Sequence, residues 1–173
     1  MTNDFPPAFA RQYDSHLRHL KLKGLQPKTI DAYARAIRGE HEVVIDFAVE
    51  RGLPNLWIVG WSFGTELALK YAIDEPVLGA ILLSPPLHRT SDQELERWAH
   101  SDKKLVALIP ELDDYLTPTQ AEQRFAMIPK IELIAVDGAK HLWVGEAATK
   151  RVLNEIVRIV NPAKFPLPDT FVI

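Results

Sequence analysis

The chain has 173 residues, 47% of them hydrophobic and 25% charged, with a formal net charge of −3, which favours one globular domain or one domain with an appendage. It contains no apolar run of the roughly 18–20 residues that a membrane span needs, and its first residues lack the basic and apolar regions of a signal peptide. Because it contains no cysteine, disulfides, thiolate catalysis and cysteine metal sites are excluded, and we expect a cytoplasmic location.

Charge is unevenly distributed along the chain. Residues 1–39 carry seven basic and three acidic side chains, whereas the remaining residues carry 13 and 20. Such asymmetry predicts that the first segment has a different origin or partner from the rest. We therefore expect two parts, a helical extension over residues 1–39 and a main domain over residues 40–173.

Two helices are predicted in the first segment, at about Pro7–Leu22 and Pro27–Arg38, because apolar residues recur there at spacings of three and four. A third helical stretch is predicted over residues 40–51. From Phe9 to Arg38 the sequence resembles the start of the core-binding domain of tyrosine recombinases (phage-type integrases), an all-helical DNA clamp. The resemblance implies a DNA-binding ancestor and a fusion protein. Two short helices are a poor DNA-binding unit, so nucleic acid is not the partner we expect.

Beyond residue 51, short apolar runs alternate with helical patterns. The apolar runs are predicted strands, at 56–59, 80–83, 105–109 and 131–136, and the helical patterns cover 63–74, 91–100, 118–127 and 146–160. Continuous apolar runs are typical of parallel strands that are covered on both faces. The alternation therefore predicts an α/β fold with about four parallel strands and flanking helices. The proline-rich tail from Asn161 is predicted to be an extended surface segment.

The segment Gly60-Trp-Ser62-Phe-Gly64 stands between the first of these strands and a helical pattern. A sharp strand-to-helix turn exposes a serine hydroxyl, and the two glycines let the backbone pass closely there. Serine is a poor nucleophile unless a base and an oxyanion site lie beside it. Strand, motif and helix occur in the order that this turn requires, so we interpret Ser62 as a catalytic nucleophile.

A base and an orienting acid are expected after later strands, in the order serine, acid, histidine. His141 follows the strand predicted at 131–136 and is the candidate base. After the strand predicted at 105–109 come two adjacent candidate acids, Asp113 and Asp114, with Glu111 as a third. Because parallel strands end at one edge of a sheet, these residues are expected to converge with Ser62.

Residues from about 40 to 162 resemble an α/β hydrolase of the small lidless esterase or dienelactone-hydrolase-like kind. The resemblance is carried by the serine motif, by the Asp114-x-x-x-Pro118 step and by Gly138-Ala-Lys-His141. In that family the acid lies four residues before such a proline, which favours Asp114 over Asp113. The resemblance also implies that the backbone N–H of Phe63 is one oxyanion donor. The family's earlier strands, and the loop that supplies a second donor, are not recognisable upstream, so we expect a truncated α/β-hydrolase fold.

Five residues near the proposed triad are candidate walls of a substrate pocket: Trp61, Pro86, His88, Leu142 and Trp143. Simple core packing is an equally good interpretation of Trp61, Leu142 and Trp143. Asp137 could suggest a metal when paired with His141, but no cluster with metal-ligand spacing supports one. Neither a metal nor another cofactor is therefore expected.

These residues predict a serine carboxylesterase that cleaves short-chain esters through an acyl-enzyme. Its activity is expected to be modest and promiscuous, because one oxyanion donor is not accounted for. The alternatives are a catalytically impaired remnant that acts only in association, and DNA binding by the N-terminal arm. A shortened sheet also leaves a strand edge unpaired, and such an edge invites pairing or covering. We therefore expect a homodimer or higher homo-oligomer, with the helices of residues 1–39 covering that side or exchanged between subunits.

Overall fold

The computed structural model of the chain describes residues 44–168. The chain divides between Pro54 and Asn55 into two units. The helices predicted before residue 40, the recombinase-like segment and the boundary predicted after Gly39 lie outside the described residues and stay predictions. Residues 169–173 also lie outside them.

The described part of the first unit is a helical turn and its end. Residues 44–50 are helical, within the helix predicted over 40–51. Gly52 follows with a φ of 63°, and the N–H of Leu53 donates to the carbonyl of Ala48 at 3.0 Å. A residue in the left-handed region with a backbone bond reaching back into the last turn is a common helix end, and glycine adopts that conformation at little cost.

The second unit is built on a four-stranded parallel sheet in the order β1-β2-β3-β4. The strands are β1 (Trp57–Trp61), β2 (Gly79–Leu83), β3 (Lys104–Leu112) and β4 (Glu132–Lys140). Each of the four predicted apolar runs therefore forms a strand. All five residues of β2 are buried, as expected for a parallel strand covered on both faces.

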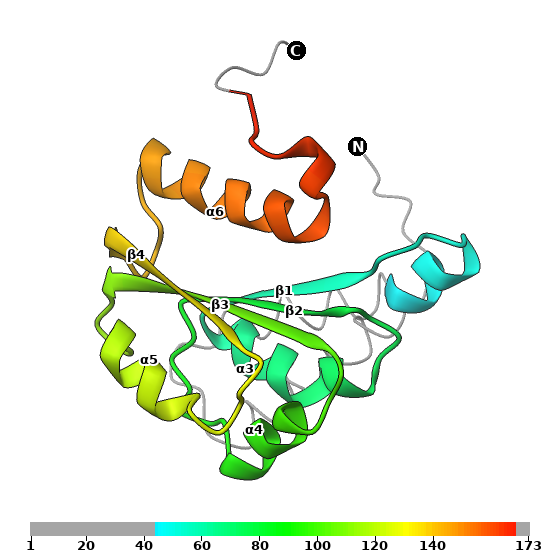
Figure 1. The fold of residues 1–173 in the computed structure, drawn as a ribbon, viewed down its shortest axis with the longest axis horizontal. Helices are drawn as coiled ribbons and strands as arrows, with labels where there is room; N and C mark the ends of the chain where they lie inside the picture. Colours follow the sequence, from blue (N-terminus) through cyan, green and yellow to red (C-terminus); the bar gives the residue numbers. More distant parts are fainter. Residues whose placement is uncertain (1–43, 169–173) are drawn as a thin grey trace, which may run out of the picture. The chain divides into compact units, whose positions relative to one another are not determined.

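Helices cover both faces of this sheet, as predicted. They are α3 (Phe63–Tyr71), α4 (Asp92–Ala99), α5 (Pro118–Arg124) and α6 (Glu146–Val160), with short 3₁₀ turns at Ala72–Asp74 and Pro162–Lys164. Helices α3, α4 and α5 lie on one face and α6 on the other (Figure 1). The 3₁₀ turn at 162–164 interrupts the tail that was predicted to be extended.

Two of these helices begin at capping boxes whose residue pattern is present in the sequence. Ser91 accepts from the N–H of Glu94, and Thr117 accepts from the N–H of Gln120, while each N3 side chain accepts from the N-cap backbone in return. These pairs satisfy backbone donors that a helix start leaves unpaired. Helix α5 therefore begins at Thr117 and Pro118, without a cap from either aspartate upstream.

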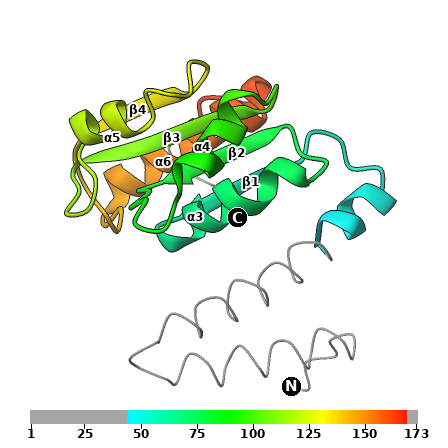
Figure 2. The same cartoon turned by 90° about the horizontal axis from the view of Figure 1, so that it is seen from below.

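The core lies in two layers, one on each side of the sheet. On the α6 side, Val152 packs with strand residues and with Trp143 in a cluster that includes Ile81, Val106 and Val136. On the other side, the indole of Trp98 in α4 donates to the carbonyl of Leu69 in α3 at 2.7 Å. Figure 2 shows α3 and α4 side by side along the sheet. The two layers hold the strand ends in fixed relative positions.

Strands β3 and β4 are longer than the sequence predicts. This extension determines which residues come first after these two strands. Leu112 of β3 pairs with Lys140 of β4 beyond an irregularity in the ladder, so pairing continues past Pro110. As a result, the first residues after the four strands are Ser62, Ser84, Asp113 and His141. The carboxyl ends of parallel strands meet at one edge of a sheet, and these four side chains therefore gather there.

Candidate active site

Ser62 occupies a strained turn between β1 and α3. Its φ of 50° and ψ of −121° lie in a region that side-chain-bearing residues rarely adopt, at a cost on the order of 1–3 kcal/mol. The turn is held by backbone bonds on both sides: the N–H of Ser62 donates to the carbonyl of Leu83, and the N–H of Thr65 donates to the carbonyl of Ser62, both at 2.9 Å. The hydroxyl of Thr65 donates to the same carbonyl at 2.6 Å. This framework presents the Ser62 side chain at the edge of the sheet.

The two glycines of the motif are not equivalent. A Cβ at Gly60 would lie 2.5 Å from the carbonyl oxygen of Gly64, which no real contact allows, whereas a Cβ at Gly64 would meet nothing within 4 Å. The close backbone approach inferred from the sequence is therefore real, but only Gly60 is required for it. Gly64 contributes its backbone to the contact and has space for a side chain.

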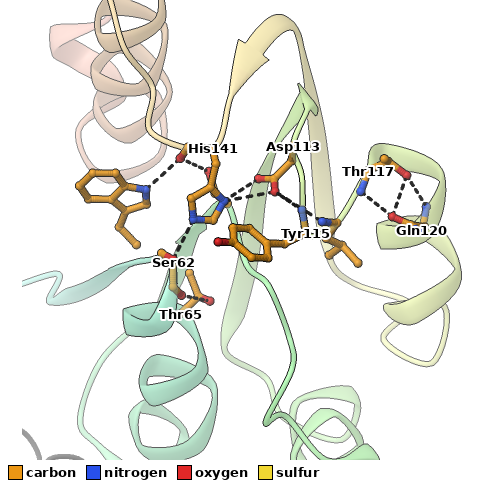
Figure 3. Close-up of polar contacts among 10 residues, drawn as sticks. Ser62, Thr65, Asp113, Tyr115, Thr117, Gln120 and His141 are labelled. Carbon is orange, nitrogen blue, oxygen red and sulfur yellow. Dashed lines mark hydrogen bonds and ion pairs between the residues drawn. The ribbon is translucent and has the colours of Figure 1, made fainter. Parts of the chain in front are cut away.

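His141 joins Ser62 to a buried carboxylate. Its Nε2 lies 2.8 Å from the Ser62 Oγ, and its Nδ1 lies 3.0 Å and 3.2 Å from the two carboxylate oxygens of Asp113 (Figure 3). Because a carboxylate only accepts hydrogen bonds, Nδ1 donates to Asp113, which leaves Nε2 to accept from the Ser62 hydroxyl. The exposed fractions of the Asp113 and His141 side chains are only 1% and 10%, so water is largely excluded from this pair.

The carboxylate at His141 belongs to Asp113, so the preference for Asp114 is corrected on geometry. Asp113 Oδ1 also accepts from the N–H of Tyr115 at 2.8 Å, which fixes the carboxylate in a local turn. Asp114 is exposed. The spacing of four residues before Pro118 favoured Asp114. The structure differs because β3 extends to Leu112, which makes Asp113 the first residue beyond the strand.

The backbone carbonyl of His141 is anchored by two side chains from other strand ends. It accepts from the Ser84 hydroxyl at 3.0 Å and from the Trp61 indole N–H at 3.2 Å. Trp61 was a predicted pocket residue, and the structure places its indole against the backbone of His141. Ser84 was not singled out as a site residue, although it directly follows a fully buried strand. That position was the available signal.

Tyr115 is a second residue that the sequence analysis missed. Its ring meets the His141 ring edge-on, with centroids 4.7 Å apart, and meets the His88 ring in the same way at 5.6 Å. Figure 3 shows it beside the imidazole. The predicted pocket residue His88 is therefore connected to the site through Tyr115. A tyrosine two residues after a candidate acid carries no signal of its own in one sequence.

The other predicted pocket residues fall in different environments. Leu142 is 61% exposed and Pro86 is partly buried, so both remain candidate walls. Trp143 is 7% exposed and belongs to the core cluster under α6. For Trp143 the packing interpretation is therefore the correct one. Its backbone turns sharply, with a φ of 52°.

Phe63, the predicted oxyanion donor, is the first residue of α3, so its amide lies at a helix N-terminus, where N–H groups favour anionic oxygen. The loop after β2 is tied to this helix, because the Arg89 N–H donates to the buried carboxylate of Glu66 at 2.9 Å. The Arg89 guanidinium lies 5.5 Å from the centre of the Phe63 ring. Residues 84–90 are thereby held at the rim of the site.

Two absences hold for residues 44–168. Within this range, no group of three or more histidine and acidic side chains is arranged to hold a metal ion. In the same range, no helix is both long enough and apolar enough to cross a membrane.

Solved structures of other proteins share this architecture. The chain is similar to an uncharacterized protein from Bacillus cereus ATCC 10987, with 19% identity and a TM-score of 0.58 over 75% of this chain and 44% of that one. It is similar to an alpha-beta serine hydrolase homologue from Coxiella burnetii, with 16% identity and a TM-score of 0.57 over 83% and 63% of the two chains. It is also similar to the esterase domain of a Rhodothermus marinus protein, with 14% identity and a TM-score of 0.57 over 70% and 68%. No protein-family model matches the sequence, and no curated protein sequence matches it.

These similarities show the fold. The described sheet and its helices form a truncated α/β-hydrolase fold, which confirms the fold predicted from the sequence. The chain spans 44% and 63% of the length of the first two of these structures.

Proposed function

We propose that the protein is a serine hydrolase that cleaves short-chain carboxylic esters. The observation that carries the proposal is the unbroken line of contacts from the Ser62 Oγ through His141 to the Asp113 carboxylate, at 2.8 Å and 3.0 Å. Nucleophile, base and orienting acid in this arrangement are the constellation of acyl transfer. The fold adds support, since the similar structures include an alpha-beta serine hydrolase homologue and an esterase domain.

The proposed reaction uses these contacts. As the Ser62 Oγ bonds to the acyl carbon, His141 Nε2 takes the hydroxyl proton and the carbonyl oxygen becomes an oxyanion. When the bond to the alkoxy group breaks, Nε2 returns the proton to that oxygen, the alcohol leaves and the acyl-enzyme remains. Water then attacks the acyl carbon, losing its proton to Nε2, and the acid is released as Ser62 regains its proton. Asp113 holds the imidazole in one tautomer and stabilises the imidazolium that forms.

The Phe63 amide is the proposed oxyanion donor, since it belongs to the residue after the nucleophile. A second donor is not assigned, and losing one donor costs on the order of 100–1,000-fold in rate. We therefore propose modest and promiscuous turnover. The connection from β2 to α4 has only residues 84–91, too few for a long lid, which favours small esters such as nitrophenyl acetate and butyrate. A cysteine-free chain is consistent with the cytoplasm.

The test is a panel of nitrophenyl esters of increasing acyl length, assayed on wild type, Ser62→Ala and Ser101→Ala. Ser101 is the matched control, a serine before β3 whose hydroxyl accepts from the Lys103 N–H. We expect Ser62→Ala to abolish hydrolysis, since removing such a nucleophile costs about a million-fold, and Ser101→Ala to retain it. Activity that survives in Ser62→Ala would exclude the proposal.

Labelling with a fluorophosphonate separates this proposal from an impaired remnant. The probe forms a covalent bond to an activated serine, and mass spectrometry then locates it. Label on Ser62 together with ester turnover supports a working hydrolase. Label on Ser62 without turnover identifies a catalytically impaired remnant whose nucleophile is still activated.

A further inference from the structure

The two outer strands of the sheet, β1 and β4, each leave one backbone edge without a partner strand among residues 44–168. The direction of the β1 hydrogen bonds shows which groups lie on its edge. The Leu56 carbonyl accepts from Leu78 and the Ser62 N–H donates to Leu83, so the even-numbered residues of β1 face β2. Because backbone groups alternate in direction along a strand, the N–H and C=O groups of Trp57, Val59 and Trp61 point outward.

The same reasoning identifies the outward groups of β4. The Ser84 N–H donates to the Leu108 carbonyl, so even-numbered residues of β3 face β2 and odd-numbered ones face β4. Ile109 is paired in register with Ala135. In a parallel ladder the residue opposite a bonded one points away, so Ala135 is the outward-facing counterpart of Val59.

The two edges differ in their side chains. Strand β4 carries Glu132, Asp137 and Lys140. Glu132 forms an ion pair with Arg158. The pKa of Arg158 is raised above its ordinary value, chiefly by its hydrogen bond to Glu155 and also by its hydrogen bond to Glu132. Strand β1 carries no charge, and Val59 and Trp61 are 45% and 49% exposed. Proteins protect free edges with charged residues, so β4 has the chemistry of a solvent edge and β1 has that of an interface.

We propose that the outer edge of β1 pairs in antiparallel fashion with β1 of a second copy of this chain, around a two-fold axis at Val59. The outward residues are spaced so that the strand complements itself. Val59 then faces the partner's Val59, and Trp57 faces the partner's Trp61. Each such pair exchanges two backbone hydrogen bonds, and the same patch serves both subunits, as a two-fold interface requires.

The side chains on this edge favour the same partner. Every second side chain of a strand lies on the same face of the sheet, and in β1 these are Trp57, Val59 and Trp61. Their face is the one on which Trp57 packs against the α6 core cluster. In this pairing the indole of Trp61 lies across the strand boundary from the indole of the partner's Trp57, two residues from the axis at Val59. Directly opposed aromatic side chains stabilise an antiparallel strand pair, and this uncharged, aromatic edge is complementary to a second copy of itself.

The second copy also contributes to the candidate active site. This part of the proposal rests on the proposed function. Trp61 immediately precedes Ser62 and donates to the His141 carbonyl. The partner's Trp57 covers the side of Trp61 that is exposed in one copy. Two active sites therefore flank one interface, each supported by a tryptophan of the other subunit.

Single-cysteine cross-linking in the full chain tests the pairing, because the natural sequence has no cysteine. In the proposed dimer the Cα atoms of the two residues 59 lie about 5.5 Å apart, within the range that a disulfide spans. We expect Val59→Cys to form a covalent dimer on mild oxidation and Ala135→Cys, on the other edge, to stay monomeric on a denaturing gel. No cross-link in Val59→Cys, or an equal cross-link in both variants, would overturn the proposal.

Light scattering on lysine variants gives a second measurement. Wild type and Ala135→Lys are expected to have the mass of a dimer, and Val59→Lys the mass of a monomer. A monomeric wild type, or a Val59→Lys that stays dimeric, would mean that this edge is covered by other residues of the chain or is left free, and either result rejects the pairing. Neither measurement uses ester hydrolysis, so this proposal and the proposed function fail separately.

Discussion

The turn after β1 and the turn after β4 hold their functional side chains in opposite ways. Ser62 is positioned by backbone bonds at its own turn and by the absence of a side chain at Gly60. His141 is positioned by side chains from the ends of the three other strands, Trp61, Ser84 and Asp113. The position of Ser62 is therefore mainly a product of local geometry, and the position of His141 is a product of the assembled sheet.

This difference determines which changes each position tolerates. At the Ser62 turn, added volume forces the backbone to move, so substitutions act through steric strain. At His141, the backbone carbonyl and the ring are each held by hydrogen bonds from residues as many as 80 positions away, so substitutions act through lost polar partners.

After the loss expected for Ser62→Ala, the largest effect is expected at Asp113, the proposed orienting acid. Asp113→Asn replaces a purely accepting carboxylate by an amide that also donates, which permits the wrong imidazole tautomer, and a loss of about 10,000-fold in kcat/KM is expected. The neighbouring exposed variant Asp114→Asn is the matched control and should keep near-normal kcat/KM. A larger loss in Asp114→Asn than in Asp113→Asn would mean that the two roles are reversed.

Smaller effects, on the free energy of unfolding, are expected at the two motif glycines. Alanine should destabilise the protein at Gly60 and stabilise it at Gly64. Gly60→Ala places a Cβ against the Gly64 carbonyl, and overpacking of this kind destabilises by roughly 1–3 kcal/mol. Gly64→Ala has space, and Gly64 is the second residue of α3. Because alanine is favoured over glycine by up to about 1 kcal/mol inside a helix, a stabilisation smaller than that is expected in this first turn.

Urea unfolding at one fixed protein concentration measures both changes, since stability depends on concentration in an oligomer. Equal destabilisation by the two alanines would show that the motif is strained on both sides of Ser62. Ester hydrolysis by Gly64→Ala is expected to continue, because its backbone is not displaced.

The smallest effects are expected from the two anchors of the His141 carbonyl. Trp61→Phe and Ser84→Ala each remove one hydrogen bond, at a cost of roughly 0.5–1.5 kcal/mol in the free energy of unfolding. The double variant leaves the carbonyl without either partner, so its loss should exceed the sum of the single losses. Unfolding curves of the four proteins in this cycle provide the measurement, and strictly additive losses would show that the two anchors act independently.

Much of the fold was predictable because its signals are local. Continuous apolar runs in four places predicted the four strands, and Ser91 and Thr117 stand at capping boxes that are visible in the sequence. The turn at Ser62 was predictable for the same reason, since strand, glycine, serine and helix follow one another within a few residues.

The identity of the acid was not predictable in this way. Asp113 and Asp114 are adjacent and chemically identical, and the distance to Pro118 favoured the wrong one. The outcome depends on how far β3 pairs with β4, because the bridge between Leu112 and Lys140 extends both strands. Pairing between residues 28 positions apart leaves no trace in the local pattern of either strand.

The sequence by itself determined the class of fold and singled out Ser62 and His141, because hydrophobic patterning and turn chemistry act between near neighbours in the chain. Only the tertiary structure decided that Asp113 contacts His141 Nδ1, that Ser84 and Tyr115 contact His141, and that Trp143 belongs to the core. Each of these depends on the register of parallel strands and on which side chain comes first beyond a strand end. Register is set by packing across the whole sheet, and a single sequence does not record it.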